Sequence, residues 1–234
     1  MYVHTRFIGR VVTAVLAAAL TVSVGAQTPL QSGRRLALPS TGTEGLSGSF
    51  WRTALADGGP MPTVERLLVV GPDGRVIGEA NGDGDHVLLP EAVDELLAAK
   101  PVRATLVHNH PGGVSLSGND LSQLGKPGVE RVIAVAPDGS VFEATAGPKF
   151  DRGTFDERYL KMLSEMTERV NREARRDGVS LDRVYPNLCH LTALALDRAG
   201  VIRYRMTPSL KLRVELDRYR HVLEWTVGHD KQYR

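Results

Sequence analysis

The segment from Val102 to Pro111 (VRATLVHNHP) constrains the fold of this chain more than any other part. It has strand character up to the proline, and residues two apart in a strand share a face. His108 and His110 are therefore expected to point one way, and Asn109 the other. A Pro-Gly-Gly turn at 111–113 ends the strand. The sequence thus predicts two neighbouring imidazoles at the carboxyl end of one strand.

A helix start follows this turn, at residues 117–120 (SGND). A serine three residues before a carboxylate is typical of a capped helix N-terminus. We expect this short helix to bring Asp120 back over the strand end, beside His108 and His110. Two imidazoles and one carboxylate leave one position of a tetrahedral zinc ion open for water, which distinguishes a catalytic zinc site from a structural one. The pattern therefore predicts a Zn²⁺ site with these three ligands in a metal-dependent hydrolase.

Each piece alone has a plainer explanation. A histidine on a strand is more often packed or exposed than bound to a metal, and Ser-x-x-Asp is often only a capping box. The order and spacing of the pieces together favour the metal site. The tripeptide His-Asn-His does not indicate an HNH nuclease, because that name describes residues dispersed over a longer unit.

The pattern resembles that of the JAMM zinc metalloproteases, also called MPN-plus or JAB domains. Their motif is an upstream Glu, then His-x-His-Pro, a short loop and Ser-x-x-Asp. Here the motif reads Glu65, HNHP at 108–111 and SGND at 117–120, and the resemblance covers about 61–146. The HNHP form is most similar to the bacterial and phage branch that includes RadC-like proteins. One departure is that six residues separate the second histidine from the serine, where the usual pattern has seven, so a tighter loop is expected.

The resemblance implies a metallopeptidase that acts on a protein or peptide substrate. His108, His110 and Asp120 would hold Zn²⁺ and bring the pKa of a water toward about 7. Glu65 would take the proton of the attacking water and return it to the leaving amine. Ser117 would donate a hydrogen bond to the oxyanion of the tetrahedral intermediate.

The identity of the general base is open between two glutamates. Glu65 begins the segment VERLLVVGPDGRVIGEA, in which 67–70 and 75–80 are expected to form two strands joined by a Pro-Asp-Gly turn. Glu79 is the alternative base, because it lies on the second of these strands. Glu65 is favoured because it lies ahead of the first apolar strand, where the family's glutamate is found.

The order of elements predicts an α/β fold. Two strands, a helix at 90–100, the histidine strand, a short helix and a hairpin at 129–144 indicate a three-layer domain with a mixed sheet, JAB/MPN-like under the resemblance. We place this domain at 61–147, after an irregular lead-in at 27–60. Residues 148–234 are expected to form a mostly helical C-terminal region, with helices at 155–177, 187–199 and 210–227.

The first 26 residues have the layout of a secretory signal peptide. Arg6 and Arg10 precede an apolar run that ends in small residues, and cleavage is expected after Ala26. The run is shorter than the roughly 20 residues that a spanning helix needs, so no stable membrane span is expected. An exported protein, periplasmic or secreted, follows if the signal is real, and a cytoplasmic one otherwise. Cys189 is the single cysteine, so no intrachain disulfide can form, and we expect it to be buried and structural.

Charge and motif together limit the function classes. The net charge is +2, and the basic residues after 148 are interleaved with acidic ones, which indicates solvated helix faces and no nucleic-acid partner. A zinc metallopeptidase is the leading hypothesis. The alternative is a phage- or toxin-associated JAB-fold module that serves binding or assembly, with vestigial or no catalysis. A third class, metal-assisted hydrolysis of a non-peptide amide such as deamination, lacks its Pro-Cys-x-x-Cys ligands here. The oligomeric state stays open.

Overall fold

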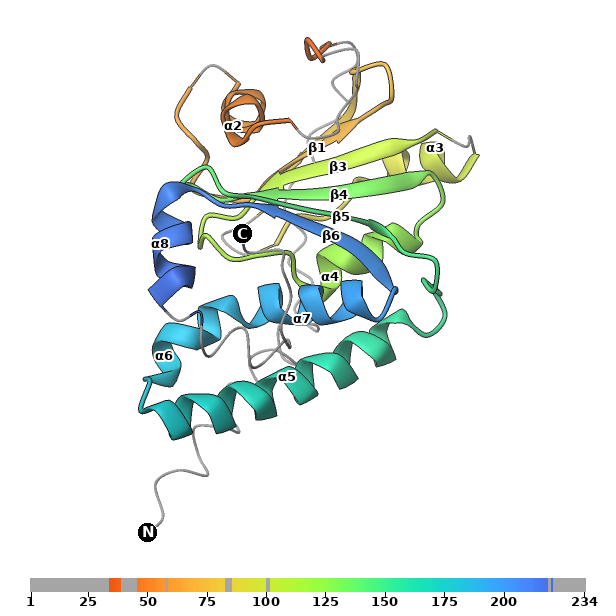
Figure 1. Ribbon diagram of the computed structural model, residues 1–234. Coiled ribbons are helices and arrows are strands. Elements are labelled where there is room, and N and C mark those ends of the chain that lie inside the picture. The colour runs from red at the N-terminus through yellow and green to blue at the C-terminus, as the bar shows by residue number, and fades with distance from the viewer. Residues whose placement is uncertain are drawn as a thin grey trace.

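The structure is a computed structural model that describes residues 34–38, 46–57, 59–82, 86–99, 102–218 and 220 (Figure 1). One mixed sheet runs through this part of the chain, with strand order β2-β1-β3-β4-β5-β6. Its strands are β1 (Arg66–Val70), β2 (Val76–Asn81), β3 (Ala104–Asn109), β4 (Val129–Val135), β5 (Val141–Ala146) and β6 (Ile202–Thr207). The expected α/β class with a mixed sheet is confirmed.

The parallel pairing of β3 with β4 determines where the site forms. All other neighbouring strands run antiparallel. Parallel neighbours need a crossover connection of a dozen or more residues. Here residues 110–128 make that crossover, and they contain the short helix α4 (Gly118–Ser122) and the 3-10 turn η1 (Gln123–Gly125). The crossover carries α4 past the carboxyl end of β3, which is where the histidines lie.

Helices cover both faces of the sheet (Figure 1). Helix α2 (Gly48–Ala56) lies on one face, where Trp51 and Leu55 pack on Leu68, Val107 and neighbouring residues. The other face is covered by α4 and by α7 (Leu188–Arg198), and the long helix α5 (Phe155–Asp177) lies on the outer side of α7. The remaining helical elements are α3 (Glu91–Ala99), α6 (Leu181–Val184), η2 (Tyr185–Asn187) and α8 (Leu210–Arg218). The side chains of His108 and His110 point to the face that α4 and α7 cover.

Helix α7 is buried from His190 to Leu196, on all its sides. A helix that is apolar all round belongs inside a protein rather than on its surface. The reason here is that α7 lies between the sheet and the amphipathic α5 (Figure 1). Helix α5 has the bounds that its apolar stripe predicts, and it ends at Gly178, whose φ of 66° suits a residue without a side chain.

Two segments differ from the sequence-based expectation. The lead-in at 27–60 contains helix α2, which begins where the Ser47 hydroxyl accepts a hydrogen bond from the Phe50 N–H. The C-terminal region contributes strand β6 to the sheet, so it is not helical throughout. The helix expected at 210–227 is described as far as Arg218 and at residue 220. The expected signal peptide lies outside the described residues.

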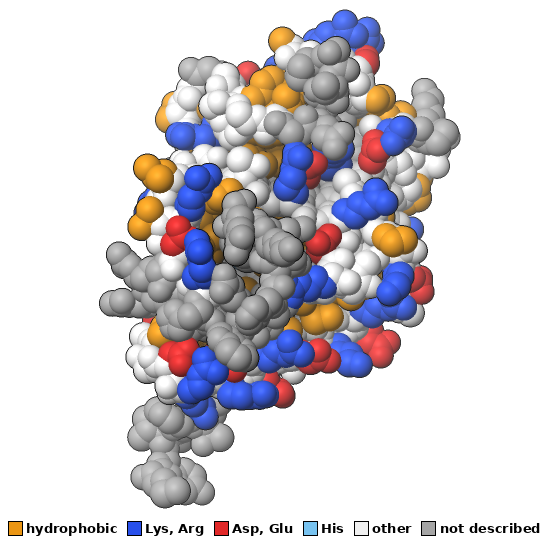
Figure 2. Space-filling view, in the orientation of Figure 1, with side chains coloured by type: hydrophobic (Ala, Val, Ile, Leu, Met, Phe, Trp, Pro, Cys, Tyr) orange, Lys and Arg blue, Asp and Glu red, His pale blue; other side chains and the backbone are white. Residues whose placement is uncertain are grey.

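The surface charge and the length of the helices indicate which classes of partner suit this protein. Over the face shown in Figure 2, Lys and Arg side chains are interspersed with Asp and Glu. Within the described ranges, no helix has both the length and the apolar character needed to cross a bilayer. This agrees with the expectation of no stable membrane span, as far as the structure describes the chain.

Candidate metal centre

His108 and His110 lie at the carboxyl end of the central strand β3 and point to the same side of the sheet. The backbone of His108 pairs with Leu67 of β1 and with Ala134 of β4. Both imidazoles are buried, with residue exposures of 3% and 5%, and their Nε2 atoms lie 2.8 Å apart. Because residues two apart in a strand share a face, both rings point to the same place, as expected.

Asp120 joins the two histidines from helix α4. Its Oδ1 lies 3.1 Å from the Nε2 of His108, and its Oδ2 lies 3.5 Å from the Nε2 of His110. One ligand atom from each of the three residues lies within 4.8 Å of the others. No other group of His, Cys, Asp and Glu in the described part of the chain meets this criterion. The three expected metal ligands are thus brought together.

The carboxylate of Asp120 is held in place by a capping box. The Ser117 N–H donates to Asp120 Oδ2 at 2.6 Å, and the Asp120 N–H donates to Ser117 Oγ at 3.2 Å. The plainer explanation of the Ser-x-x-Asp motif is therefore correct, and the same aspartate also reaches the histidines. Ser117 Oγ uses a lone pair in this bond, which leaves its hydroxyl hydrogen free to donate elsewhere.

Helix α4 is also held from outside by α5, whose Tyr159 in turn contacts α7. A Cβ on Gly118 would lie 2.6 Å from Cε1 of Tyr159, so the aromatic ring packs directly on the start of α4. The Tyr159 hydroxyl shares a hydrogen bond with the half-buried Cys189 thiol. Burial raises the pKa of both groups, although the tyrosine partly offsets this for the thiol. Cys189 is a packing partner here, and it is less buried than expected.

Glu65 reaches the cluster, whereas Glu79 does not. Glu65 precedes β1, is 7% exposed, and has its Oε1 3.7 Å from His110 Nε2. Glu79 pairs in register with Leu68, which faces α2, so it lies on the opposite side of the sheet from the histidines. Its Oε2 instead accepts from Arg66 Nη2 at 2.6 Å. The geometry favours Glu65 of the two candidate bases.

Protonation at the cluster follows from burial and close carboxylates. Burial lowers the pKa of His108, against the charge and hydrogen bond of Asp120. Burial would also lower the pKa of His110, but Asp120 and Glu65 together raise it to about 9. Burial would raise the pKa of Asp120, but His108 and His110 hold it well below its usual range. The buried carboxylate of Glu65 and the partly buried carboxylate of Asp120, beside two imidazoles, therefore favour a positive charge at this point, whether a proton or a metal ion.

The loop between His110 and Ser117 fixes one tautomer. His110 Nδ1 lies 2.9 Å from the Val114 carbonyl oxygen, which can only accept, so Nδ1 carries a hydrogen. In the neutral ring Nε2 then has its lone pair directed at the cluster, which is the form a metal requires.

A buried hydrogen-bonded chain, absent from the sequence-based expectation, holds the same loop. Ser115 Oγ lies 2.8 Å from the hydroxyl of Tyr204 on β6, and that hydroxyl lies 2.8 Å from Nδ1 of His190 on α7. Burial lowers the pKa of His190 to about 4. Cys189 and His190 bond different tyrosines, which agrees with the expectation that these adjacent helical residues diverge. The C-terminal region therefore supports the loop beside His110.

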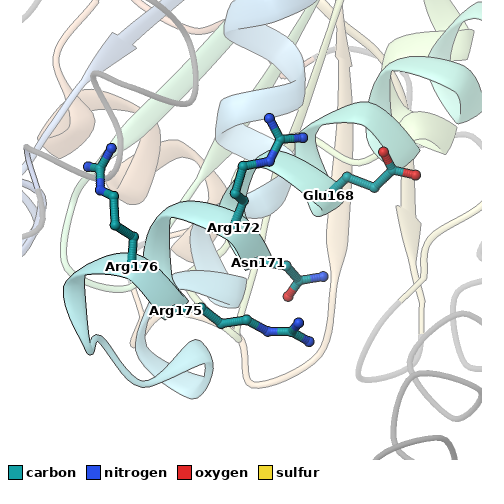
Figure 3. Close-up of a pocket in the computed structure, with 5 residues that line it drawn as sticks. All are labelled: Glu168, Asn171, Arg172, Arg175 and Arg176. Carbon is teal, nitrogen blue, oxygen red and sulfur yellow. The ribbon is translucent and has the colours of Figure 1, made fainter.

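A hollow at the end of α5 lies at the surface and is mostly basic, unlike the buried histidine cluster. It is lined by Glu168, Asn171, Arg172, Arg175 and Arg176 (Figure 3). The arginine side chains extend in different directions rather than toward one point (Figure 3). Basic residues in the last turn of a helix interact favourably with its dipole, which is sufficient reason for their position.

No protein-family model, curated protein or solved structure gives a significant match to the chain.

Proposed function

We propose that this protein is a zinc-dependent hydrolase of the JAMM type, which cleaves a peptide or isopeptide bond. The observation that carries the proposal is the convergence of His108, His110 and Asp120 at the end of β3, with the Glu65 carboxylate 3.7 Å from His110. A JAB/MPN-like fold is part of the proposal. Its support is the mixed sheet, in which the third ligand comes from the crossover that follows the histidine strand.

The donor set fits zinc. Two imidazole nitrogens and one carboxylate oxygen make up a common set of protein ligands for catalytic zinc. Ligand atoms at tetrahedral positions about 2.0 Å from one ion lie about 3.3 Å apart. The separations of 2.8 Å between the two Nε2 atoms and 3.1 Å between His108 Nε2 and Asp120 Oδ1 are close to this value. Shifts of a few tenths of an ångström would complete the site.

The chain's own residues supply the rest of the chemistry. A bound zinc ion acts as a Lewis acid and lowers the pKa of water toward about 7. The Glu65 carboxylate takes a proton from the water that attacks the carbonyl carbon, and returns it to the nitrogen of the leaving amine. The Ser117 hydroxyl donates to the carbonyl oxygen as it becomes negative. Burial of Glu65 and both histidines keeps bulk water from screening these charges.

Metal content tests the binding step. We expect about one zinc per purified chain by elemental analysis, and none in the His108→Ala/His110→Ala double variant. A folded, zinc-supplemented wild type without zinc would refute the proposal.

A pair of glutamate variants tests the catalytic step. Glu65→Gln is expected to keep zinc and to lower kcat at least about 100-fold, because the general base is removed. Glu79→Gln is the matched control, since Glu79 bonds Arg66 on the other side of the sheet, and we expect near wild-type turnover. The probes are short fluorogenic peptides and peptides joined through a lysine side chain. Equal turnover of both variants would show that Glu65 is not the base.

One observation favours a second candidate. The loop between His110 and Ser117 is one residue shorter than the pattern of the family that the motif resembles. A chain that binds zinc but hydrolyses neither class of probe would instead be a JAB-fold binding or assembly module.

A further inference from the structure

We infer that Asn109 is the positioning residue for the general base, and that it fixes Glu65 at its distance from the metal ligands. The inference rests on the proposed function for its catalytic consequence. Asn109 lies between the two histidine ligands but faces the other side of β3, and it is 1% exposed. The tripeptide His-Asn-His therefore holds two ligands on one side and a clamp for the base on the other.

The amide of Asn109 bonds the backbone on both sides of Glu65. Its Oδ1 accepts from the Arg66 N–H at 2.8 Å, and its Nδ2 donates to the Val64 carbonyl at 2.9 Å. Nδ2 also lies 3.2 Å from the Pro62 carbonyl as a second acceptor. The flanking residues of the base are thus tied directly to the strand that carries the ligands.

This clamp is needed because the backbone ladder stops short of Glu65. The pairing of β1 with β3 ends at Leu67 opposite His108, and the next N–H of β1 in the chain, that of Arg66, donates to the Asn109 side chain instead of to a backbone carbonyl of β3. From the β2 side, the Gly82 N–H donates to the Glu65 carbonyl at 2.7 Å. A side-chain amide has the same donor and acceptor groups as a peptide unit. Asn109 therefore extends the β1–β3 ladder beyond its last backbone pair.

The catalytic consequence follows from geometry. Proton transfer requires the carboxylate within hydrogen-bond reach of the attacking water, and a displacement of about 1 Å can cost about 100-fold in rate. Without the Asn109 bonds, the segment that carries Glu65 is held to β2 by the Gly82 N–H but no longer to β3, whereas His108, His110 and Asp120 keep their own supports. An Asn109 variant should therefore keep zinc binding and lose turnover.

The test uses the full chain with zinc bound. Asn109→Ala is expected to keep about one zinc per chain, to lower kcat about 10- to 100-fold, and to change KM much less. Amide hydrogen exchange at Arg66 should become at least about tenfold faster, because its acceptor is gone. Asn171→Ala is the matched control, since Asn171 accepts a hydrogen bond from the Tyr185 hydroxyl far along α5. It should lower stability without changing kcat or the exchange at Arg66.

Each outcome decides the inference. Loss of zinc in Asn109→Ala would overturn it, because the residue would then act on the ligands. Unchanged exchange at Arg66, or wild-type kcat with fast exchange, would overturn it as well. If Asn109→Ala does not fold, Asn109→Ser keeps a small polar group that is too short to bond the peptide groups on both sides of Glu65, and a fall in kcat with intact zinc is expected. If the wild type hydrolyses no probe, the proposed function fails, and exchange at Arg66 alone still tests the clamp.

Discussion

At the scale of single residues, the face of the strand on which a side chain lies decides whether it reaches the candidate metal site. The two-residue period of a strand was sufficient to predict that His108 and His110 share a face, and the helix-start motif was sufficient to predict Asp120 beside them. The choice between Glu65 and Glu79 needed the register of β1 against its neighbours, which no local pattern contains. The contacts of Asn109 also depend on that register.

Ser117 combines a structural role with a proposed catalytic one, and substitution can separate them. Ser117→Ala should lower the free energy of unfolding by about 1 kcal/mol, because the capping bond to the Asp120 N–H is lost. It should also lower kcat about 100-fold, because the donor to the oxyanion is removed. Ser117→Thr keeps the hydroxyl and should restore both.

Denaturant titration and steady-state kinetics measure these two effects. Ser180→Ala is the control, since Ser180 stands at the N-cap of α6 without a side-chain capping bond. If Ser117→Ala were destabilised but turned over normally, Ser117 would be only a cap.

At the scale of elements, the position of α4 is decided by neighbours that are distant in sequence. The helix start could be predicted from its motif, but the ring of Tyr159 that covers Gly118 comes from α5. A single turn of helix has little stability of its own, because the nucleus costs more than its few hydrogen bonds return. Packing from α5 therefore holds α4, and with it Asp120, against the end of β3.

Gly118→Ala tests this packing. The added Cβ would meet the Tyr159 ring at 2.6 Å, so α4 or the ring must move, and Asp120 moves with the helix. We expect the zinc dissociation constant to rise about 10- to 100-fold, as for other changes in groups that orient metal ligands. Competition with a chromogenic chelator measures this constant. Gly112→Ala in the same crossover is the control, because its Cβ would meet no atom within 4 Å. Equal zinc affinity in both variants would contradict the role of the ring.

At the scale of the whole molecule, the C-terminal region completes the sheet and supports the site. The segment Ile202–Thr207 alternates buried and exposed residues along its first half, which is a strand pattern, yet it is short and lies between two strong helical segments. It pairs with β5 because the preceding helix α7 packs along the sheet and brings the chain back to its edge. A local sequence pattern does not specify this arrangement. Through Tyr204, β6 joins α7 to the loop beside His110. The helical expectation for this region thus missed the strand that links it to the loop beside His110.

This link makes the stability of the whole molecule sensitive to acid. His190 is 3% exposed, and burial lowers its pKa to about 4, whereas an unfolded histidine has a pKa of about 6.5. The unfolded chain therefore binds this proton first as the pH falls. The contribution of His190 to stability is complete above about pH 6.5 and is lost progressively toward pH 4, by about 3 kcal/mol.

His190→Asn, whose side chain can still bond the Tyr204 hydroxyl but does not titrate, isolates this contribution. Urea unfolding of both proteins at pH 7 and pH 4, with a chelator present so that zinc release does not contribute, gives the difference between their unfolding free energies. We expect the wild type to lose about 3 kcal/mol more than the variant between these pH values, because only its unfolded state gains the His190 proton. If both proteins lost the same unfolding free energy between these pH values, His190 would titrate normally in the folded protein. The hydrogen bonds from Ser115 through Tyr204 to His190 would then be open to water.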